Sequence, residues 1–236
     1  MSRIAIITGA SSGIGAAAAE QFINQEFLVF NVSRRPCTVD GVENLCGDLS
    51  SSAAVNALAG DIAVQLDSHS ATEVCLVHNA ALMLKDTAEH CADRELERAL
   101  QINVMAINAL NRHLLPLLPQ PSSVIFIGST LSEKAVAGAF SYVVSKHAQL
   151  GMMRATCQDL MGKGIHTALV CPGFTDTEML RDHIGHDEEV LAGISQMNSF
   201  GRLIKPTEIA NLIVWAHHNP VINGAVLHAN LGQIEH

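Results

Sequence analysis

Short apolar runs alternate with longer helical patterns along the chain. The runs cover residues 3–7, 27–32, 44–46, 74–77, 124–127, 165–171 and 225–229, of which 44–46 is the weakest. Each is bounded by Gly, Ser, Asn or Pro, and several are rich in β-branched residues. Such short, continuous apolar runs are typical of strands that are buried on both faces of a sheet.

Segments of helical length lie between these runs. They cover residues 13–24, 52–65, 95–115, 141–161 and 206–217. The last one begins with Pro206 and has Glu208 in its first turn, which is a common helix start. This alternation predicts a doubly wound α/β fold of Rossmann type, in which one parallel sheet carries helices on both faces. Ligands of such folds bind beyond the carboxyl ends of the strands, so the residues that follow each strand are of most interest.

Composition favours one catalytic domain over residues 1–236. Hydrophobic residues make up 48% and charged residues 16%, which supplies a core and excludes general disorder. Lys plus Arg is 14 against 23 for Asp plus Glu, a net charge of −9, so we expect no nucleic-acid partner and no anionic membrane partner. The longest stretch without a charged residue, 113–132, contains three prolines and is not expected to span a membrane.

The cysteines indicate a reducing compartment. The chain has 6 of them, and no two lie within four residues of each other, so a CxxC metal or redox pair is not expected. The N-terminus leads directly into an apolar strand pattern and lacks the features of a signal peptide. We therefore expect a cytoplasmic location.

A glycine-rich turn connects the first strand to an alanine-rich helix. The turn reads Thr8-Gly9-Ala10-Ser11-Ser12-Gly13-Ile14-Gly15. Glycines permit a tight turn and let backbone N–H groups approach a pyrophosphate at the helix N-terminus, where the helix dipole favours negative charge. A plain connecting turn is the alternative, but the strand–turn–helix position favours nucleotide binding.

The second strand ends in Ser33-Arg34-Arg35 and has no acid where NAD-binding sites usually hold the ribose 2′-hydroxyl. Paired guanidinium groups would suit a 2′-phosphate, so NADP(H) is preferred over NAD(H), which is not excluded. A solvated basic turn before Pro36 is the alternative.

Further candidates follow the next two strands. Asp48-Leu49 follows the third strand, where the carboxylate either accepts a hydrogen bond from the adenine amino group or caps the helix that begins among residues 50–52. Asn79-Ala80 follows the fourth strand, and small residues there would let the backbone approach a cofactor.

A Ser/Tyr/Lys set follows the fifth strand. Ser129 comes directly after the strand, Tyr142 lies 13 residues later and is the only tyrosine, and Lys146 is four residues further on. The i to i+4 spacing places Tyr142 and Lys146 on one helix face. A nearby ammonium is expected to lower the pKa of the phenol, making it usable for proton transfer.

These motifs together resemble the short-chain dehydrogenase/reductase family over nearly the whole chain. The matching elements, in order, are the turn 8–15, Asp48, Asn79-Ala80, Asn103, Ser129, Tyr142, Lys146, Pro172-Gly173 with Thr177, and Gly201-Arg202 with Pro206 and Glu208. Any one of these is a weak signal, whereas the ordered set is highly specific. The chain departs from the family pattern at His78, at Ala81 and at Ser12, where members that prefer NADP often carry Lys or Arg.

The resemblance implies a role for each residue. Tyr142 would be the general acid or base, Ser129 would bind the substrate oxygen, and Lys146 would bind the nicotinamide ribose. Asn103 would hold a water that links Lys146 to solvent, although a structural buried asparagine is the alternative. The expected cofactor contacts are Gly9, Ser11, Ser12, Gly13, Ile14, Gly15, Arg34, Arg35, Asp48, Leu49, Asn79, Ala80, Tyr142, Lys146, Pro172, Gly173, Thr175 and Thr177.

The chain is accordingly expected to be an NADP(H)-dependent oxidoreductase that interconverts a small-molecule carbonyl and an alcohol. A catalytically silent NADP(H)-binding regulator is the alternative, but such a protein should have lost one of Asn103, Ser129, Tyr142 or Lys146. An isomerase or dehydratase of nucleotide-linked sugars is disfavoured, because those relatives generally carry a substantial C-terminal substrate domain.

Residues 178–199 occupy the place of a substrate lid. Their apolar residues could close over an apolar substrate with 82–84, Leu131 and Val136, or could form a helical pair packed on the domain. His183 and His186 beside acids could suggest a metal site, but solvated polar residues explain them, and no metal is expected. Small and apolar residues in 95–115 and 141–161, with the habit of the family, predict a homodimer or homotetramer.

Overall fold

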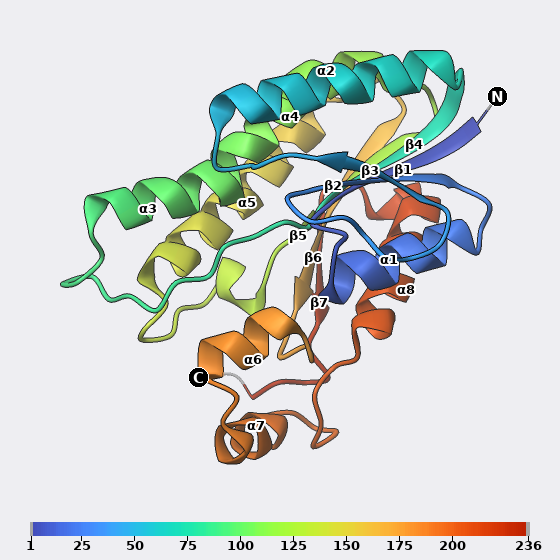
Figure 1. The fold of residues 1–236 in the computed structure, drawn as a ribbon. Coiled ribbons are helices and arrows are strands. Elements are labelled where there is room, and N and C mark those ends of the chain that lie inside the picture. Colours follow the sequence, from blue (N-terminus) through green and yellow to red (C-terminus); the bar gives the residue numbers. More distant parts are fainter. Residues whose placement is uncertain (1, 235–236) are drawn as a thin grey trace.

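The protein is described by a computed structural model that covers residues 2–234. Seven strands form one parallel sheet in the order β3-β2-β1-β4-β5-β6-β7 (Figure 1). The strands are β1 (Ser2–Thr8), β2 (Leu28–Ser33), β3 (Val42–Cys46), β4 (Ala71–His78), β5 (Ser122–Ile127), β6 (Ile165–Pro172) and β7 (Ala225–Ala229). The order reverses at β1, where β1 lies between β2 and β4, so the carboxyl ends of these strands open a crevice typical of ligand sites.

Helices cover both faces of the sheet. They are α1 (Gly13–Ile23), α2 (Ser52–Ser68), α3 (Asp93–Leu100), α4 (Ala106–Leu114), α5 (Phe140–Asp159), α6 (Glu178–Ile184), α7 (Glu188–Ser195) and α8 (Pro206–His218). One apolar cluster packs α1 and α8 on one face, and another packs α2, α4 and α5 on the other. Every residue of β5 and β6 is buried, which explains the apolar runs 124–127 and 168–171 within them, although Ser122, Ser123, His166 and Thr167 are buried as well. The doubly wound fold predicted from the sequence is confirmed.

The predicted helix 95–115 is interrupted in the structure. A π-helical turn, η1 (Gln101–Met105), separates α3 from α4, and fully buried Asn103 lies in it. The extra residue of a π turn rotates its side chains relative to a regular helix, and such turns are frequent at functional sites. The apolar pattern of the segment does not reveal this turn, because the contacts that stabilise it come from other parts of the chain.

The segment 178–199 folds as two short helices beyond the carboxyl ends of the strands, α6 and α7 (Figure 1). Gly185 ends α6 in a left-handed conformation with φ of 74°, a common way to terminate a helix. Within residues 2–234 no helix has both the length and the apolar character that crossing a membrane would require.

Candidate active site

The glycine turn after β1 has a conformation that requires glycine. Gly9 and Gly13 have φ of 72° and 56°, in the left-handed region that side chains disfavour. A Cβ on Gly15 would overlap the carbonyl oxygen of Gly9 and come within 2.6 Å of Asn79 Nδ2. Ser12, the N-cap of α1, makes no capping bond with its side chain, so N–H groups of the first helical turn stay available to an anion.

Polar side chains of the neighbouring strands fix this turn. Thr8 Oγ1 accepts hydrogen bonds from the N–H groups of Asn79 (2.9 Å) and Ala80 (3.0 Å). Asn79 Nδ2 donates in return to the carbonyls of Thr8 (3.0 Å) and Gly9 (3.1 Å). Asn79 therefore shapes the turn through its side chain. Asn31 was missed from the sequence: it is fully buried, and its Oδ1 accepts from Ala10 N at 3.0 Å.

The two arginines after β2 are exposed and differ in their contacts. Arg35 forms an ion pair of 3.0 Å with Glu178 of α6, and this acid raises the pKa of Arg35. Arg34 lies close enough to Asp48 to contribute to the lowered pKa of that carboxyl, whose largest cause is the hydrogen bond from Ser50 N (2.9 Å). Thus Arg34 lies near Asp48, which follows β3, and Arg35 connects the end of β2 to the predicted lid.

Asp48 does not cap α2, which corrects one of its two interpretations. Its carboxylate accepts from Ser50 N, and the N-cap of α2 is Ser51, whose hydroxyl accepts from Ala54 N at 3.3 Å. Asp48 is exposed, whereas the side chain of Leu49 is buried in the core under α2. The exposed carboxylate remains the candidate contact of an adenine amino group.

Ser129 and Tyr142 meet at the carboxyl end of β5. The Ser129 hydroxyl lies close enough to the Tyr142 phenol to influence its pKa, and only 8% of Tyr142 is exposed. Burial raises the pKa of Tyr142 to about 12, because it disfavours the charged phenolate, while the nearby Ser129 hydroxyl acts in the opposite direction. The expectation of a lowered phenol pKa is therefore wrong for this structure.

The hydrogen bonds of Lys146 point away from the Tyr142 phenol, which is the physical reason why the ammonium does not lower the pKa of the phenol. Its Nζ lies 5.3 Å from the centroid of the Tyr142 ring and donates to the Ile127 carbonyl (2.7 Å) and to Gln149 Oε1 (3.0 Å). Lys146 is 1% exposed, and burial lowers its pKa to about 7. The ammonium therefore lies behind the ring, where it does not offset the burial of the phenol.

Gln149 is the main site residue that the sequence analysis missed. Its side chain is also 1% exposed, and its Nε2 donates to the main-chain carbonyl of Asn103 at 2.7 Å. One amide thus joins Lys146 to the π turn. A polar residue three positions after Lys146, on the buried face of the helix, was the available signal.

The side chain of Asn103 is satisfied by protein groups. Its Oδ1 accepts from Leu82 N (2.7 Å), and its Nδ2 donates to Leu82 O (2.9 Å) and Ser145 Oγ (2.9 Å). These bonds join the loop after β4 to α5. They correspond to the structural interpretation of Asn103, and the water relay through this residue stays a prediction.

Asp86 was also missed, and it positions the start of α5. Its Oδ1 accepts from Ser141 N at 3.1 Å, and its main chain accepts from Phe140 N at 3.2 Å. Burial raises the pKa of Asp86, but the polar groups around the carboxylate, Ser141 first among them, outweigh burial, so the pKa lies below its usual value. A carboxylate at a helix N-terminus is stabilised by the helix dipole, and Tyr142 follows one residue later.

The segment after β6 completes the site. Gly173 approaches the C-terminal segment closely, since a Cβ there would lie 3.0 Å from the Asn230 Cα. Thr175 Oγ1 donates to the Gly173 carbonyl at 3.1 Å, and the Thr177 hydroxyl accepts from Leu180 N at 3.3 Å as the N-cap of α6. The Thr177 methyl group would lie 3.1 Å from a Cβ on Gly13. The structure thus places the segment after Pro172 against the glycine turn.

Further histidines singled out in the sequence can now be placed. His186 forms a 3.0 Å pair with exposed Asp182, while His183 is partly buried. His78 is buried and shares a 2.7 Å hydrogen bond with Asn111 of α4, and burial lowers its pKa to about 4, so it is a neutral core residue.

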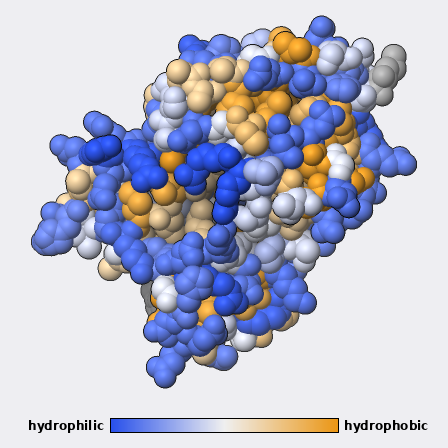
Figure 2. Space-filling view, viewed as in Figure 1, coloured by the Kyte–Doolittle hydropathy of each residue, from blue (hydrophilic) through white to orange (hydrophobic). Residues whose placement is uncertain are grey.

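Figure 2 shows an apolar area above α6, framed by hydrophilic residues.

The arrangement fits a dinucleotide. The glycine turn leaves no room for side chains, the α1 N-terminus is not capped by a side chain, and Thr177 lies against the turn. A pyrophosphate would bind at the turn, and Tyr142 with Ser129 would face the reacting end. A nicotinamide cofactor, when bound, supplies or accepts the hydride.

Comparisons with known proteins agree with this geometry. The family model described as enoyl-(acyl carrier protein) reductase matches residues 9–233. The rhamnolipids biosynthesis 3-oxoacyl-[acyl-carrier-protein] reductase of Pseudomonas aeruginosa is 30% identical over 90% of this chain and 88% of its own length.

Solved structures show the same fold. Ligand-free aldohexose dehydrogenase of Thermoplasma acidophilum has a TM-score of 0.89 at 22% identity, covering 98% of this chain and 93% of that one. A 3-oxoacyl (acyl-carrier-protein) reductase of Agrobacterium tumefaciens with NADP bound has a TM-score of 0.86 at 22% identity, with the same coverage of both chains. The chain belongs to the short-chain dehydrogenase/reductase family of oxidoreductases.

Proposed function

We propose that this protein is an NADP(H)-dependent oxidoreductase that interconverts a carbonyl and an alcohol, with Tyr142 as the general acid and base. The observation that carries the proposal is the proximity of the Ser129 hydroxyl to the Tyr142 phenol at the carboxyl end of β5, with Lys146 buried behind the ring. This pair lies on the same edge of the sheet as the glycine turn after β1.

The residues divide the chemistry of carbonyl reduction between them. Tyr142, with its pKa raised to about 12, keeps its proton at neutral pH and is in the right state to donate it to a carbonyl oxygen. The Ser129 hydroxyl donates a hydrogen bond to the same oxygen and stabilises its developing negative charge. To stabilise the phenolate that the proton transfer leaves behind, the Lys146 ammonium turns from Ile127 and Gln149 toward the phenol oxygen. In alcohol oxidation the tyrosinate accepts the proton instead.

The preference for NADP(H) is supported by the residues at the end of β2. Two exposed guanidinium groups, Arg34 and Arg35, lie where a ribose 2′-phosphate would bind, and Asp48 is the only acid among the cofactor contacts named above. The Agrobacterium tumefaciens relative was solved with NADP bound. Arg35 must leave Glu178 to reach a phosphate, so cofactor binding and the position of α6 are expected to be coupled.

The substrate class to test first is the 3-oxoacyl thioesters. The Pseudomonas aeruginosa relative is named for that reduction and shares 30% of its residues with this chain. The apolar area above α6 would suit an acyl chain (Figure 2). In this proposal residues 178–199 act as the lid, since α6 and α7 lie beyond the carboxyl ends of the strands and only Leu191 among their residues is buried.

The same proposal includes a homo-oligomer. Met105 and Val144 are large apolar residues that are exposed on η1 and α5, and burying them in an interface between copies would be favourable. Light scattering at micromolar concentration tests this point, and a monomer would refute it.

The decisive experiment measures NADPH and NADH oxidation with 3-oxoacyl thioesters, diketones, quinones, ketosteroids and aromatic aldehydes. We expect turnover with NADPH that Tyr142→Phe abolishes while leaving NADPH binding intact. Turnover that survives Tyr142→Phe would refute the assigned role of Tyr142. NADPH binding without turnover on the whole panel would favour the alternative, a silent NADP(H)-binding regulator.

A further inference from the structure

A second cluster of chemically active side chains lies at the opposite end of the sheet. Glu73 is near the amino end of β4, and His217 and His218 are the last two residues of α8. One ligand atom from each of the three lies within 4.8 Å of the other two. Glu73 is five residues before His78 along β4, which separates the cluster from the carboxyl ends of the strands by roughly 16 Å.

His217 is the buried member of this cluster, with 4% exposure. Its Nδ1 lies 2.7 Å from Ser123 Oγ, and Ser123 uses its hydroxyl proton on Cys75 Sγ at 3.4 Å. Ser123 accepts from His217 in the tautomer that carries the ring proton on Nδ1. This tautomer leaves a lone pair on Nε2.

That lone pair faces a carboxylate. His217 Nε2 is 3.0 Å from Glu73 Oε1, yet it has no hydrogen-bond partner. Two electron-rich atoms at this distance repel each other, and either a proton on Nε2, as in the other tautomer, or a metal cation removes that repulsion. The neutral form of an imidazole is the form that binds metals.

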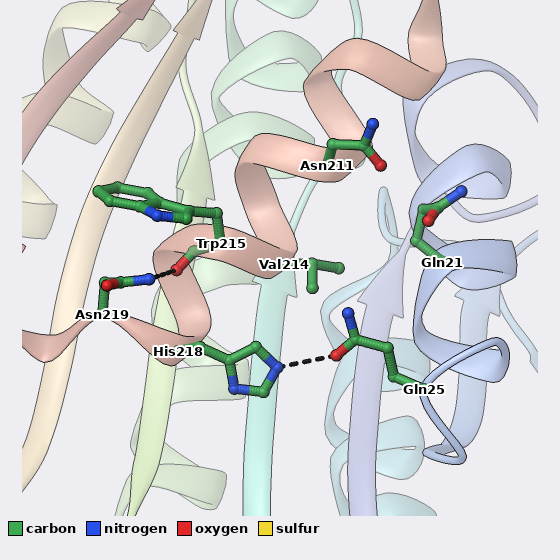
Figure 3. Close-up of a pocket in the computed structure, with 7 residues that line it drawn as sticks. All are labelled: Gln21, Gln25, Asn211, Val214, Trp215, His218 and Asn219. Carbon is green, nitrogen blue, oxygen red and sulfur yellow. Dashed lines mark hydrogen bonds between the residues drawn. The ribbon is translucent and has the colours of Figure 1, made fainter.

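His218 presents a further nitrogen from the exposed side. Figure 3 shows its ring turned toward Gln25, whose Oε1 accepts from Nε2 at 2.8 Å. Because a carbonyl oxygen only accepts, Nε2 carries the proton and Nδ1 carries the lone pair. Both histidines are at the C-terminal end of α8, where the helix dipole favours positive charge.

We propose that Glu73, His217 and His218 form a Zn²⁺ site, with solvent as the fourth ligand on the side of His218. Two histidine nitrogens and one carboxylate oxygen are a donor set that zinc accepts. Ligands at about 2.1 Å from a tetrahedral zinc are about 3.4 Å apart, so the 3.0 Å between His217 Nε2 and Glu73 Oε1 would widen by a few tenths of an ångström on binding. The ion would join the end of α8 to β4.

The charges around the cluster determine the zinc affinity that we expect. Arg3, on β1 beside β4, and His166 and His218 all act to lower the pKa of His217, and Arg3 stacks on Phe27 and donates to the Gln25 carbonyl. A cation at the site would be repelled by Arg3 and attracted by Glu73. We therefore expect micromolar rather than picomolar affinity.

A hydrolytic triad is the other chemistry that this set of residues suggests. Ser123, His217 and Glu73 follow one another at 2.7 Å and 3.0 Å, in the order nucleophile, base and acid. Ser123 is fully buried in β5, however, so no substrate carbonyl reaches its hydroxyl. The accessible chemistry of the cluster is at Glu73 and His218.

The test is a titration of the chelator-treated full chain with Zn²⁺ alone, in competition with a chromophoric chelator, and with Co²⁺ to read the coordination geometry. We expect one equivalent of Zn²⁺ and a tetrahedral Co²⁺ spectrum. Glu73→Gln and His218→Gln, which change partly exposed side chains, should each weaken binding at least tenfold. The paired control is His186→Gln, which removes an exposed histidine beside Asp182 and should change nothing.

Circular dichroism checks that both variants fold, so that a loss of zinc binding can be assigned to the missing ligand and not to unfolding. No bound equivalent in the wild type would overturn the proposal. Binding that both variants retain would overturn it as well, as would an octahedral Co²⁺ spectrum without imidazole ligands. The result is independent of catalytic activity.

Discussion

Lys146 and Gln149 lie one turn apart on α5 and share a buried hydrogen bond of 3.0 Å. The other end of the Gln149 amide donates to the main-chain carbonyl of Asn103. A single side chain therefore connects the lysine behind Tyr142 to the π turn between α3 and α4. This connection makes Gln149 a positioning residue for Lys146 in the proposed reaction.

Changing Gln149 is expected to move the pH dependence of the reaction in two opposite directions. Lys146 already has a pKa lowered to about 7 by burial, so its charge is lost as the pH rises through neutrality. Gln149→Leu removes an acceptor of the ammonium and should lower this pKa, whereas Gln149→Glu adds an opposite charge and should raise it. The alkaline limb of kcat/KM for reduction should shift by about one pH unit, downward for Leu and upward for Glu.

Gln158→Leu, on an exposed position of the same helix, is the matched control and should leave the profile unchanged. A purely structural role for Gln149 would lower activity in both variants without separating their pH profiles. That outcome would contradict the positioning role.

Cofactor preference is expected to depend on Arg34, Arg35 and the partner of Arg35. Arg34→Ser and Arg35→Ser should each weaken NADPH binding about tenfold or more, because each removes charged donors to a phosphate, and should leave NADH binding unchanged. Glu178→Gln frees Arg35 from its 3.0 Å ion pair and should strengthen NADPH binding by a few-fold. Binding titrations with both dinucleotides measure these effects.

Glu189→Gln, on exposed α7, is the control for loss of a negative charge from the lid. If the arginine variants weakened NADH and NADPH equally, the basis for the NADP(H) preference would be wrong. A Glu178→Gln protein with unchanged NADPH affinity would show that Arg35 does not exchange partners.

The fold could be predicted from the sequence because its strands are marked locally. The residues of β5 and β6 are buried on both faces, so the apolar runs 124–127 and 168–171 identify them despite the polar residues at their starts, and Gly128 and Pro172 mark their ends. The π turn could not be predicted in this way. It is fixed by bonds from Asn103 to Leu82 and Ser145, which are distant in sequence.

The residues of the candidate site likewise include some that the sequence marks locally and others that only the folded structure reveals. Ser129, Tyr142 and Lys146 could be found because their residue types carry chemistry at a fixed spacing. Asp86 could not, and Gln149 was marked only as a polar residue on the buried face of its helix, since the importance of both comes from partners that only the folded chain brings to them. The pKa of Tyr142 was expected in the wrong direction for a similar reason: spacing places Lys146 on the same helix face but does not reveal that its Nζ is bonded to Ile127 and Gln149.

Gly15→Ala should abolish dinucleotide binding and destabilise the protein. The new methyl group would overlap the Gly9 carbonyl oxygen and approach Asn79 Nδ2 to 2.6 Å, and both atoms belong to the hydrogen-bonded core of the turn. Gly151→Ala is the matched control, because a Cβ there meets nothing within 4 Å and the residue lies inside α5. That control should gain about 1 kcal/mol of stability. Thermal unfolding and NADPH titration measure both effects, and a Gly15→Ala protein that still bound NADPH normally would contradict the assigned path of the pyrophosphate.

The pair formed by Arg202 and Glu208 should give the protein a pH-dependent part of its stability. Arg202 donates twice to the Glu208 carboxylate, at 2.7 Å and 2.8 Å, and Lys205 N donates at 2.8 Å. The Arg202 bond and then the Lys205 bond lower the pKa of Glu208 to about 2, from 4.5. A carboxyl whose pKa is lower in the folded state stabilises that state fully above its unfolded pKa and loses this contribution as the pH falls toward its folded pKa.

The difference in unfolding free energy between the wild type and Glu208→Gln should therefore be constant above about pH 5, shrink between about 4.5 and 2, and vanish below that range. Both side chains are partly exposed, so solvent reduces the size of the effect. Urea unfolding across this pH range measures it, with Glu188→Gln, whose contact with Arg181 is 3.7 Å, as the control. A difference that stayed constant down to pH 2.5 would show that Glu208 acts by packing alone, since only its ionised form can hold both bonds from Arg202 and anchor the chain between the lid and α8.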